Sequence, residues 1–425
     1  MAGEMSDTVS RRRISPLARV RGMYYGWAMV LALSITETTS FGILYYAFAV
    51  FLTPMHEDLG WSVAQLTGAF SLALLISGVA AVPVGRWLDR RGPRALMTAG
   101  SIVATLLVLA WAMVDSLIVY YLIWIGIGVV MAAVLYEPAF YVVATWFRRG
   151  RGRALTVLTF LAGLASVIFI PLASVLVNAY DWRTALVILA LILGVVTIPL
   201  HGLVLRRNPE ALGLEVDGGR VGSAGSAPVS GSLETSVTVR EALRAVPFWW
   251  LNAAFFLANL ATMTIIVHLI PYLIREGYSP AFAASAAGAI GLLALPGRLI
   301  FTPLGGRIER RYVTAGIFAC QTVALLVLLL SQSTAGVIAF VILFGIGFGA
   351  ITPARAALVS EMYGPAHYGS INGIVSMFIT ASRGIAPFGA GVLFTILASY
   401  QPVLWTTFAV SLLASVAALQ ARSAR

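Results

Sequence analysis

The stretch PVGRWLDRRG, residues 83–92, recurs without a gap as PLGGRIERRY, residues 303–312. The two copies share a proline, a glycine, an acidic residue and a pair of arginines at matching positions. A weaker echo pairs Pro138 with Pro353. Repetition of a motif at so long a period predicts that the chain consists of two related halves, each built on the same plan.

Outside the two copies, long apolar runs dominate the chain. Hydrophobic residues make up 60% of the 425 residues, 11% are charged and the mean hydropathy is +0.91, far from the values of a soluble domain. A membrane-spanning helix needs roughly 20 apolar residues. We therefore predict an all-α membrane protein with twelve transmembrane helices. The expected spans are residues 24–53, 62–85, 94–113, 117–146, 154–178, 184–205, 247–273, 280–304, 313–331, 335–361, 369–396 and 402–420.

These spans group into two pseudo-symmetric six-helix bundles, residues 24–205 and 247–420. The intervening residues 206–246 contain GGRVGSAGSAPVSGS, a Gly/Ser-rich sequence without an apolar period, which predicts a flexible cytoplasmic linker. Residues 1–23 and 421–425 are expected to be cytoplasmic tails. The apolar run after residue 23 is too long for a signal peptide and contains Glu37, which predicts an uncleaved first helix.

The basic residues indicate the orientation in the membrane. All 28 are arginine, and nearly all fall before the first span, in the linker or in alternate loops. On the other side lie only Arg183 and Arg275, beside acidic residues such as Asp58 and Asp115. The positive-inside rule then places both termini in the cytoplasm of a multi-pass inner (plasma) membrane protein. The net charge of +11 follows from this topology and does not indicate nucleic-acid binding.

Two arginines lie inside hydrophobic runs: Arg298 in LLALPGRLIFTPL and Arg383 in MFITASRGIAPFG. A charged side chain at membrane depth is costly unless it faces a bundle interior, a partner or a water-filled path, so it marks a functional site. Two fixed cations predict an anionic cargo. In parallel-repeat carriers such a site lies between the halves near the bilayer midplane.

The stretch GRWLDRRGPRAL, residues 85–96, resembles the loop between helices two and three of the major facilitator superfamily. The resemblance implies that fold, alternating access, and a loop that stabilises the outward-facing state. Asp89 is suited to accept hydrogen bonds at a neighbouring helix N-terminus, where the dipole favours an anion. The expected gating residues are Asp89, Arg90, Arg91 and Arg94 in the first copy, and Glu309 and Arg310 in the second.

Within this superfamily, three patches resemble the monocarboxylate transporter group and oxalate/formate-type exchangers. They are YYGWAMV at 24–30, YYAFAVFLTPMHEDLGWS at 45–62 and LYEPAFYVVATWFRRGRGRAL at 135–155. The resemblance implies that Arg298 is the helix-eight cation that binds a carboxylate, and that Arg383 is a second cation in helix eleven. Further expected substrate-binding residues are Tyr45, Tyr46, Tyr136, Asn259 and Asn372. Arg355 is expected at the inner gate, outside the site.

The proton relay of mammalian lactate carriers is not present, because Ala294 and Tyr46 stand where those carriers place Asp and Lys. Glu37 and Glu137 are the replacement candidates, since burial favours the neutral form of a carboxyl. Either could instead form a structural ion pair with Arg383 or Arg355. His268 is a third candidate, although a satisfied polar residue near its helix end explains it equally well.

These observations predict a proton-coupled symporter of small monocarboxylates such as lactate or pyruvate, working as a monomer with no cofactor or metal. Alternatives are an exchanger of the oxalate–formate type, a membrane receptor, and an efflux antiporter for lipophilic compounds. The efflux alternative is disfavoured because Leu122 stands where such antiporters carry an arginine. An enzyme is not expected, since the four histidines are scattered and match no catalytic or metal-binding spacing.

Overall fold

The structure is a computed structural model that describes residues 24–218, 237–304, 308–331 and 333–422. In this part of the chain, twelve helical segments are long and apolar enough to cross a membrane. The prediction of an all-α protein with twelve spans is therefore confirmed. The predicted tail 1–23 and residues 219–236 of the predicted linker lie outside the described residues.

The first half supplies six spans, four of which are made of more than one helix. The first span is Tyr25–Leu59 and the sixth is Trp182–Val204. The helices are α1 (Tyr25–Phe41), η2 (Gly42–Tyr46), α2 (Phe48–Leu59), α3 (Val63–Arg91), α4 (Pro93–Ala112), α5 (Leu117–Val134), α6 (Tyr136–Trp146), α7 (Arg151–Ala162), α8 (Ala165–Ala179), α9 (Trp182–Pro199) and η3 (Leu200–Val204).

In the second half each span is a single helix. The long helices are α11 (Val246–Arg275), α12 (Pro280–Leu304), α13 (Arg310–Leu330), α14 (Thr334–Tyr363), α15 (Tyr368–Leu397) and α16 (Tyr400–Gln420). Between the halves lie the short helices η4 (Pro209–Leu212), η5 (Val216–Gly218) and α10 (Val239–Arg244). Helices dominate because a bilayer offers the backbone no other hydrogen-bond partner, and a helix satisfies its own N–H and C=O groups.

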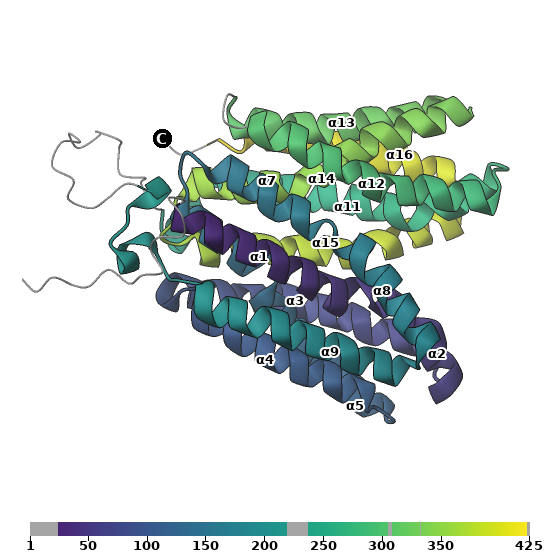
Figure 1. Cartoon of the computed structure of the whole chain (residues 1–425). Helices are drawn as coiled ribbons and strands as arrows, with labels where there is room; N and C mark the ends of the chain where they lie inside the picture. Colours follow the sequence, from purple (N-terminus) through teal and green to yellow (C-terminus); the bar gives the residue numbers. More distant parts are fainter. Residues whose placement is uncertain (1–23, 219–236, 305–307, 332, 423–425) are drawn as a thin grey trace, which may run out of the picture.

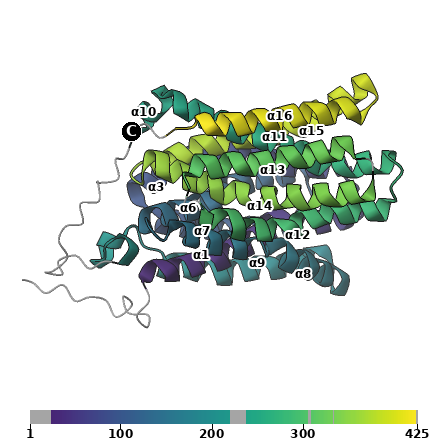
Figure 2. The same cartoon turned by 90° about the horizontal axis from the view of Figure 1, so that it is seen from above.

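The long helices run roughly parallel to one another, as Figures 1 and 2 show from two directions. In Figure 1, α4, α5 and α9 of the first half form one edge of the molecule, and α13 and α16 of the second half form the other. The start of α1 and the end of the chain lie at the same end of the bundle. We call this the arginine-rich end, because Arg86 and Arg90 in the last turns of α3, Arg148 before α7 and Arg311 at the start of α13 lie there.

Local signals explain where the helices around the repeated motif begin and end. Ser62 starts α3 with a capping box, in which its side chain and that of Gln65 each bond the other's backbone N–H. The helix ends at Gly92, whose φ of 76° is accessible mainly to glycine, and Pro93 then starts α4. The helix runs to Arg91, beyond the expected end at residue 85, because arginines favour a helix C-terminus and reach into water.

Three spans of the first half are interrupted partway along their length. The first span changes to a π-helix at η2, the fourth breaks at Leu135, and the fifth breaks at Gly163 and Leu164. Leu135 has extended backbone angles, and Pro138 three residues later cannot donate a hydrogen bond back along the helix. Irregular backbone at membrane depth is tolerated where it lines a cavity or is buried in protein, so these breaks mark the interior of the bundle.

The described parts of the linker are more ordered than the predicted flexible tether. The carboxylate of Asp217 accepts hydrogen bonds from the backbone N–H groups of Arg148, Arg149 and Gly150, at 2.7–3.2 Å. These groups lead into α7, whose N-terminal dipole favours an anion. On the far side of the linker, Val237 N–H donates to the carbonyl of Tyr363. Both ends of the linker therefore rest on the bundles that they join.

Two helix pairs connect the halves near the arginine-rich end. α3 packs along α15, and α7 packs along α12. The α3–α15 contact extends from Gly85 and Gly369 to Leu75 and Gly384, about midway along both helices. These contacts hold the two halves together at the arginine-rich end and leave room for a site between them in the middle of the bundle.

Candidate functional site

A cavity of about 1370 Å³, including its opening, lies between the two halves. Helices of both halves contribute to its wall: α1, η2, α3, α5, α6 and α7 from the first, and α11, α12, α14 and α15 from the second. The wall combines apolar side chains such as Phe41, Leu74 and Phe348 with a few polar and charged groups. This composition is typical of a small-molecule site, in which apolar walls exclude water and a few polar groups orient the ligand.

Arg383 reaches this cavity from the middle of α15 and is exposed to it. No described residue forms a hydrogen bond or ion pair with its guanidinium group. Tyr45, Tyr46 and Glu137 lie within electrostatic range, but none is in contact with it. An arginine is not deprotonated in a protein, so this side chain is a permanent cation whose N–H groups are available to a ligand.

Arg298 lines the same cavity from α12 but is partly engaged by the protein. Its Nε donates to the carbonyl of Gly349 at 3.3 Å, and its Nη1 donates to the carbonyl of Thr159 in α7, in the other half. Thr159 lies in the last turn of α7, where the helix dipole favours a cation. Arg298 has no acidic partner in the described part of the chain, so its positive charge stays uncompensated.

Aromatic residues connect the two arginines. Tyr46 in η2 lies within electrostatic range of both guanidinium groups, and Tyr136 lies within range of Arg298 and Tyr46. Tyr45 also lines the cavity. These are the three tyrosines expected in the site from the sequence, and the residues lie where helices of the first half are interrupted, in η2 and at the start of α6. The breaks were not expected from the sequence, although Pro138 was a signal for one of them.

The structure places the two expected asparagines differently. Asn259 lines the cavity, while its side-chain amide donates to the carbonyl of Phe255 in its own helix. Asn372 is fully buried and does not line the cavity. The expectation that Asn372 belongs to the substrate site is therefore corrected. Asn372 lies three turns of α15 closer to the arginine-rich end than Arg383, in the part of α15 that packs along α3.

His268 is also away from the cavity. It lines a small separate pocket between α11 and α16, where its Nδ1 lies 3.4 Å from the Tyr400 hydroxyl and its Nε2 lies 3.2 Å from the carbonyl oxygen of Pro387. The expectation that His268 could carry a proton to the cargo is therefore corrected in favour of a packing role. One turn of helix separates it from the cavity residues of α11, such as Met263.

The two candidate acids lie close together but in different environments. Glu37 in α1 is 0% exposed, and neither of its carboxyl oxygens has a hydrogen-bond partner in the described part of the chain. Glu137 in the first turn of α6 lines the cavity, accepts a hydrogen bond from Ser376 and lies 3.5 Å from Arg355. The ion pair considered from the sequence is thus present for Glu137 and Arg355. Arg355, which we expected outside the site, lies on the cavity wall.

The repeated motif contacts the other half at the arginine-rich end. Asp89 accepts hydrogen bonds from the backbone N–H groups of Gly369 and Ser370 at 2.8 and 2.9 Å, in the first turn of α15. The backbones approach so closely that a Cβ atom on Gly85 would collide with the carbonyl oxygen of Gly369. Asp89 therefore meets a helix N-terminus in the way expected from the sequence. Its role as a gate remains a prediction.

The other expected gating residues contact their own halves in the described structure. Arg94 Nε donates to the carbonyl of Gly202 at 2.7 Å, and the Arg91 guanidinium lies 4.6 Å from the centre of the Trp87 ring. Arg90 is exposed. In the second copy, Glu309 pairs with Arg311, and Arg310 pairs with Glu361 at 2.9 Å. The two copies are therefore not equivalent, because only Asp89 has a described bond across the interface.

The sequence matches the profile of the Major Facilitator Superfamily over residues 33–387 and again over residues 298–424. The chain belongs to the major facilitator superfamily. It is thus a secondary transporter with a small-molecule substrate, and not an enzyme. Membership accounts for the two six-helix halves and for the position of the cavity between them.

Relatives within the superfamily include carboxylate transporters. Monocarboxylate transporter 13 of Bos taurus is 27% identical over 353 residues, which cover 80% of this chain and 76% of that protein. The oxalate:formate antiporter of Oxalobacter formigenes is 27% identical over 233 residues, covering 53% of this chain and 51% of that protein. The resemblance expected from the sequence is confirmed as a distant homology.

Solved structures show the same fold at lower identity. The superfamily transporter FucP in the outward conformation has a TM-score of 0.72 and 14% identity, covering 92% of this chain and 98% of FucP. A bacterial homologue of the iron transporter ferroportin, in an outward-facing state, has a TM-score of 0.72 and 17% identity, covering 94% and 99% of the two chains. The superfamily fold of this chain is thereby established independently of its sequence motifs.

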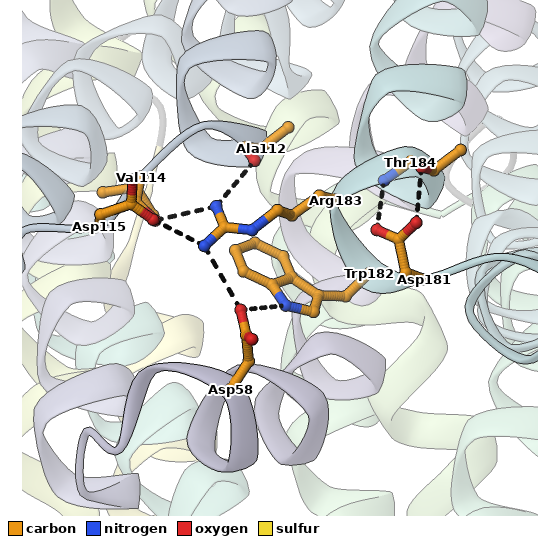
Figure 3. A network of polar contacts seen from close by, with 8 residues as sticks. All are labelled: Asp58, Ala112, Val114, Asp115, Asp181, Trp182, Arg183 and Thr184. Carbon is orange, nitrogen blue, oxygen red and sulfur yellow. Dashed lines mark hydrogen bonds and ion pairs between the residues drawn. The ribbon is translucent and has the colours of Figure 1, made fainter.

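At the end opposite the arginine-rich one, this superfamily member has a polar network that joins three connections of its first half (Figure 3). Arg183 donates to the carbonyls of Ala112 and Val114 and pairs with Asp58 at 3.3 Å and Asp115 at 2.7 Å. Its guanidinium also stacks on Trp182. The ends of α2, α4 and α9 are thus held together, which favours movement of the first half as one body.

Replacing Arg183 by alanine is expected to lower the melting temperature of the detergent-purified protein. The ion pairs are too exposed to contribute much, but the two carbonyl bonds contribute about 1 kcal/mol, which corresponds to roughly 2–4 °C. Arg275→Ala is the matched control, since Arg275 at the same end of the second half bonds one carbonyl, that of Ala398. A loss for Arg275→Ala as large as that for Arg183→Ala would show that the network adds nothing.

Proposed function

We propose that this protein carries small organic anions, namely monocarboxylates such as lactate or pyruvate, together with protons. In this proposal it works as a monomer in the inner (plasma) membrane, and its arginine-rich end faces the cytoplasm. The observation that carries the proposal is the convergence of Arg298 and Arg383, from two different helices, on one cavity between the halves. Two uncompensated cations inside a largely apolar wall fit an anion and disfavour a neutral or cationic cargo.

The charge of the cavity wall supports an anionic substrate. Among the described residues that line it, Arg298, Arg355 and Arg383 are positive and Glu137 alone is negative. Two positive charges therefore remain uncompensated. A carboxylate that lies between Arg298 and Arg383 would accept charge-assisted and bidentate hydrogen bonds, which are about twice as strong as neutral ones. Tyr46, within range of both guanidinium groups, is placed to add a hydroxyl donor.

The mechanism is alternating access around this site. The substrate enters from the end opposite the arginine-rich one, since α3–α15 and α7–α12 pack against each other at the arginine-rich end. Binding gives the guanidinium groups, which are costly to enclose without a partner, a carboxylate to pair with, so it lowers the barrier to closing the cavity over the substrate. The two halves then rock and open the site at the other end. Asp89 and the α15 N-terminus stabilise the state before this movement.

Coupling to protons would use one of the two acids beside the cavity. A buried carboxylate without a partner is costly, which makes the neutral form of Glu37 or of a released Glu137 the favoured one. If the loaded carrier occludes only with a neutral acid, each carboxylate moves with a proton. Uptake then quickens as the pH on the entry side falls.

Similarity to Monocarboxylate transporter 13 supports this substrate class, and similarity to the oxalate:formate antiporter supports a second candidate. The second candidate is an exchanger of dicarboxylates for smaller carboxylates. It is favoured by the separation of the two cations on α12 and α15, because each could hold one carboxylate group. Such an exchanger needs no titrating acid.

Uptake of radiolabelled lactate or pyruvate into proteoliposomes tests the proposal, with and without an inward proton gradient. We expect the gradient to accelerate uptake in the wild type. Uptake that the gradient leaves unchanged, together with rapid counterflow of oxalate against formate, would replace symport by exchange. In a thermal-shift screen, carboxylates should raise the melting temperature of the wild type but not of Arg298→Ala, because a ligand stabilises the folded state that binds it.

A further inference from the structure

Three polar side chains on the cavity wall form a chain of contacts between the halves. Glu137 of α6 accepts a hydrogen bond from Ser376 Oγ of α15 at 2.7 Å and lies 3.5 Å from Nη2 of Arg355. Nη1 of Arg355, in α14, donates to Ser376 Oγ at 2.7 Å. We call these three residues the latch, since α6 belongs to the first half and α14 and α15 to the second.

The latch is within reach of a bound anion. All three residues line the same cavity as Arg298 and Arg383. The side chains of Arg355 and Glu137 are 9% and 18% exposed, so both are largely desolvated yet open to the cavity on one side. A substrate carboxylate has the same chemistry as the Glu137 side chain and competes with it for the N–H groups of Arg355.

Displacement from Arg355 leaves Glu137 in surroundings that disfavour its charge. The ionisable groups around it are Glu37 from α1, Arg355 from α14, and Tyr368 and Arg383 from α15. The substrate engages both arginines, which leaves the carboxylate facing a buried acid and a tyrosine. The N-terminal dipole of α6 is the remaining favourable contribution, and it is weaker than an ion pair.

We propose that Arg355 changes partner from Glu137 to the substrate, and that Glu137 is the acid that takes up the transported proton. This inference rests on the proposed function, because it requires a carboxylate cargo and proton coupling. It makes Arg355 a third substrate-binding residue and Glu137 the coupling residue. Ser376 follows the exchange, because its hydroxyl accepts from the guanidinium and donates to the carboxylate.

The exchange conserves charge and protons. The substrate brings one negative charge, and one proton from water in the cavity forms an O–H bond with a carboxylate oxygen of Glu137. The guanidinium groups stay positive throughout. The cavity therefore carries the same net charge whether it is empty or loaded. Each substrate crosses the membrane together with one proton, so no net charge is transported. When the arginine-rich end opens, the substrate leaves, Glu137 gives its proton to water, and its carboxylate pairs with Arg355 again.

Breaking the latch also explains why substrate and proton are needed together. The bonds of Glu137 with Arg355 and Ser376 join the two halves at the cavity, in addition to the helix contacts at the arginine-rich end. A carboxylate alone would leave Glu137 ionised and unpaired, and a proton alone would leave Arg355 unpaired, each of which is costly in a desolvated place. When substrate and proton bind together, the contact between Glu137 and Arg355 is lost but neither residue is left charged and unpaired. The contact then no longer opposes separation of the halves.

Accessibility distinguishes Glu137 from the other candidate acid. Glu137 lines the cavity, whereas Glu37 is 0% exposed and does not line it. Neither carboxyl oxygen of Glu37 has a described hydrogen-bond partner. Glu37 therefore stays neutral and apart from cavity water while the substrate binds.

The test compares Glu137→Gln with Glu37→Gln in proteoliposomes. A gradient of one pH unit drives about tenfold accumulation of a monocarboxylate in a one-to-one symporter. We expect Glu37→Gln to keep this accumulation. Glu137→Gln should reduce the accumulation ratio to about one while retaining counterflow of labelled lactate, since glutamine mimics the protonated acid and leaves Arg355 to the substrate.

The affinity for lactate provides a second measurement. If the latch were purely structural, its variants would not change this affinity in the way described next. In Glu137→Gln the affinity at high pH should rise several-fold and lose its pH dependence, because no carboxylate competes for Arg355. Arg355→Ala should weaken binding by about tenfold or more. Melting temperatures of both variants report whether they remain folded.

The outcomes separate the inference from the proposed function. If the wild type moves no carboxylate, the proposed function fails and the inference fails with it. If the wild type accumulates lactate and Glu137→Gln does so equally, the inference alone is overturned. Loss of accumulation in Glu37→Gln but not in Glu137→Gln would overturn it as well, and would assign the proton to Glu37.

Discussion

Replacing Arg383 by alanine is expected to abolish carboxylate transport while leaving the protein folded. This guanidinium has no hydrogen-bond or ion-pair partner among the described residues, so its interaction energy is available to the substrate. A hydrogen bond to a charged group contributes up to about 3 kcal/mol, and its loss weakens binding on the order of 100-fold. The melting temperature should stay the same or rise, because the cation that is removed has no partner among the described residues and lies at membrane depth.

Uptake of labelled lactate and its binding to the purified protein measure this effect. Arg244→Ala is the matched control: it removes the same charge from the exposed surface of α10 and should leave both unchanged. Arg383→Lys should be intermediate, since lysine keeps the charge but not the forked geometry. Lactate uptake that survives in Arg383→Ala while oxalate uptake is lost would favour the exchanger. Survival of both activities would contradict a substrate-binding role for Arg383.

Replacing Asp89 by asparagine is expected to shift the protein toward the state that is open at the arginine-rich end. Asp89 accepts two backbone hydrogen bonds in the first turn of α15, and its charge is stabilised there by the helix dipole. Asparagine has the same size but no charge, and the NH2 group that replaces one carboxylate oxygen cannot accept a hydrogen bond. The loss is about 2 kcal/mol, which changes the ratio of the two states roughly 30-fold.

Distances between spin labels at positions 86 and 312, in a Cys320→Ala background, measure this shift. Arg86 in α3 and Tyr312 in α13 are exposed and belong to different halves. Glu309→Gln is the matched control, because Glu309 occupies the same position in the second copy of the motif but pairs with Arg311 in its own half. The prediction is wrong if both variants shift the distances equally, or if Asp89→Asn leaves them unchanged.

Much of the fold follows from the sequence for simple reasons. Spanning helices must be long and apolar, so the twelve spans are visible in composition alone. The repeat at residues 83–92 and 303–312 reveals the two halves, because it is conserved in order and spacing along the chain. What composition did not reveal are the breaks in the first, fourth and fifth spans, since apolar residues continue across η2, Leu135 and Gly163.

Site residues were predictable from the sequence where the energetic cost of a charge in the membrane identifies them. They were not predictable where the face of the helix decides whether a side chain reaches the cavity. Arg298 and Arg383 were found because a charge at membrane depth needs a reason, wherever it points. Asn372, His268 and Arg355 were misplaced, because a residue's depth along a helix does not say which face of the helix it occupies. In the structure, Arg355 turns toward Glu137 on the cavity wall, whereas Asn372 is buried and does not line the cavity.

The motif shows the same division between sequence and tertiary structure. The two copies are nearly equal in sequence, yet Asp89 bonds the N-terminus of α15 while Glu309 pairs with its neighbour Arg311. The N–H groups before α7 are bonded instead by Asp217 of the linker, a residue outside either copy. Similar sequence thus produced different contacts, because each contact depends on what the opposite half presents.

The sequence by itself determined the membrane-spanning character, the number of spans, the two halves and the presence of arginines at membrane depth, since these depend on hydrophobicity and charge along the chain. Only the tertiary structure decided which charges meet: that Arg383 has no partner among the described residues, that Arg298 reaches α7, and that Glu137 is paired with Arg355 across the interface. Such pairings depend on the rotation and packing of helices far apart in the chain, and no local pattern records them.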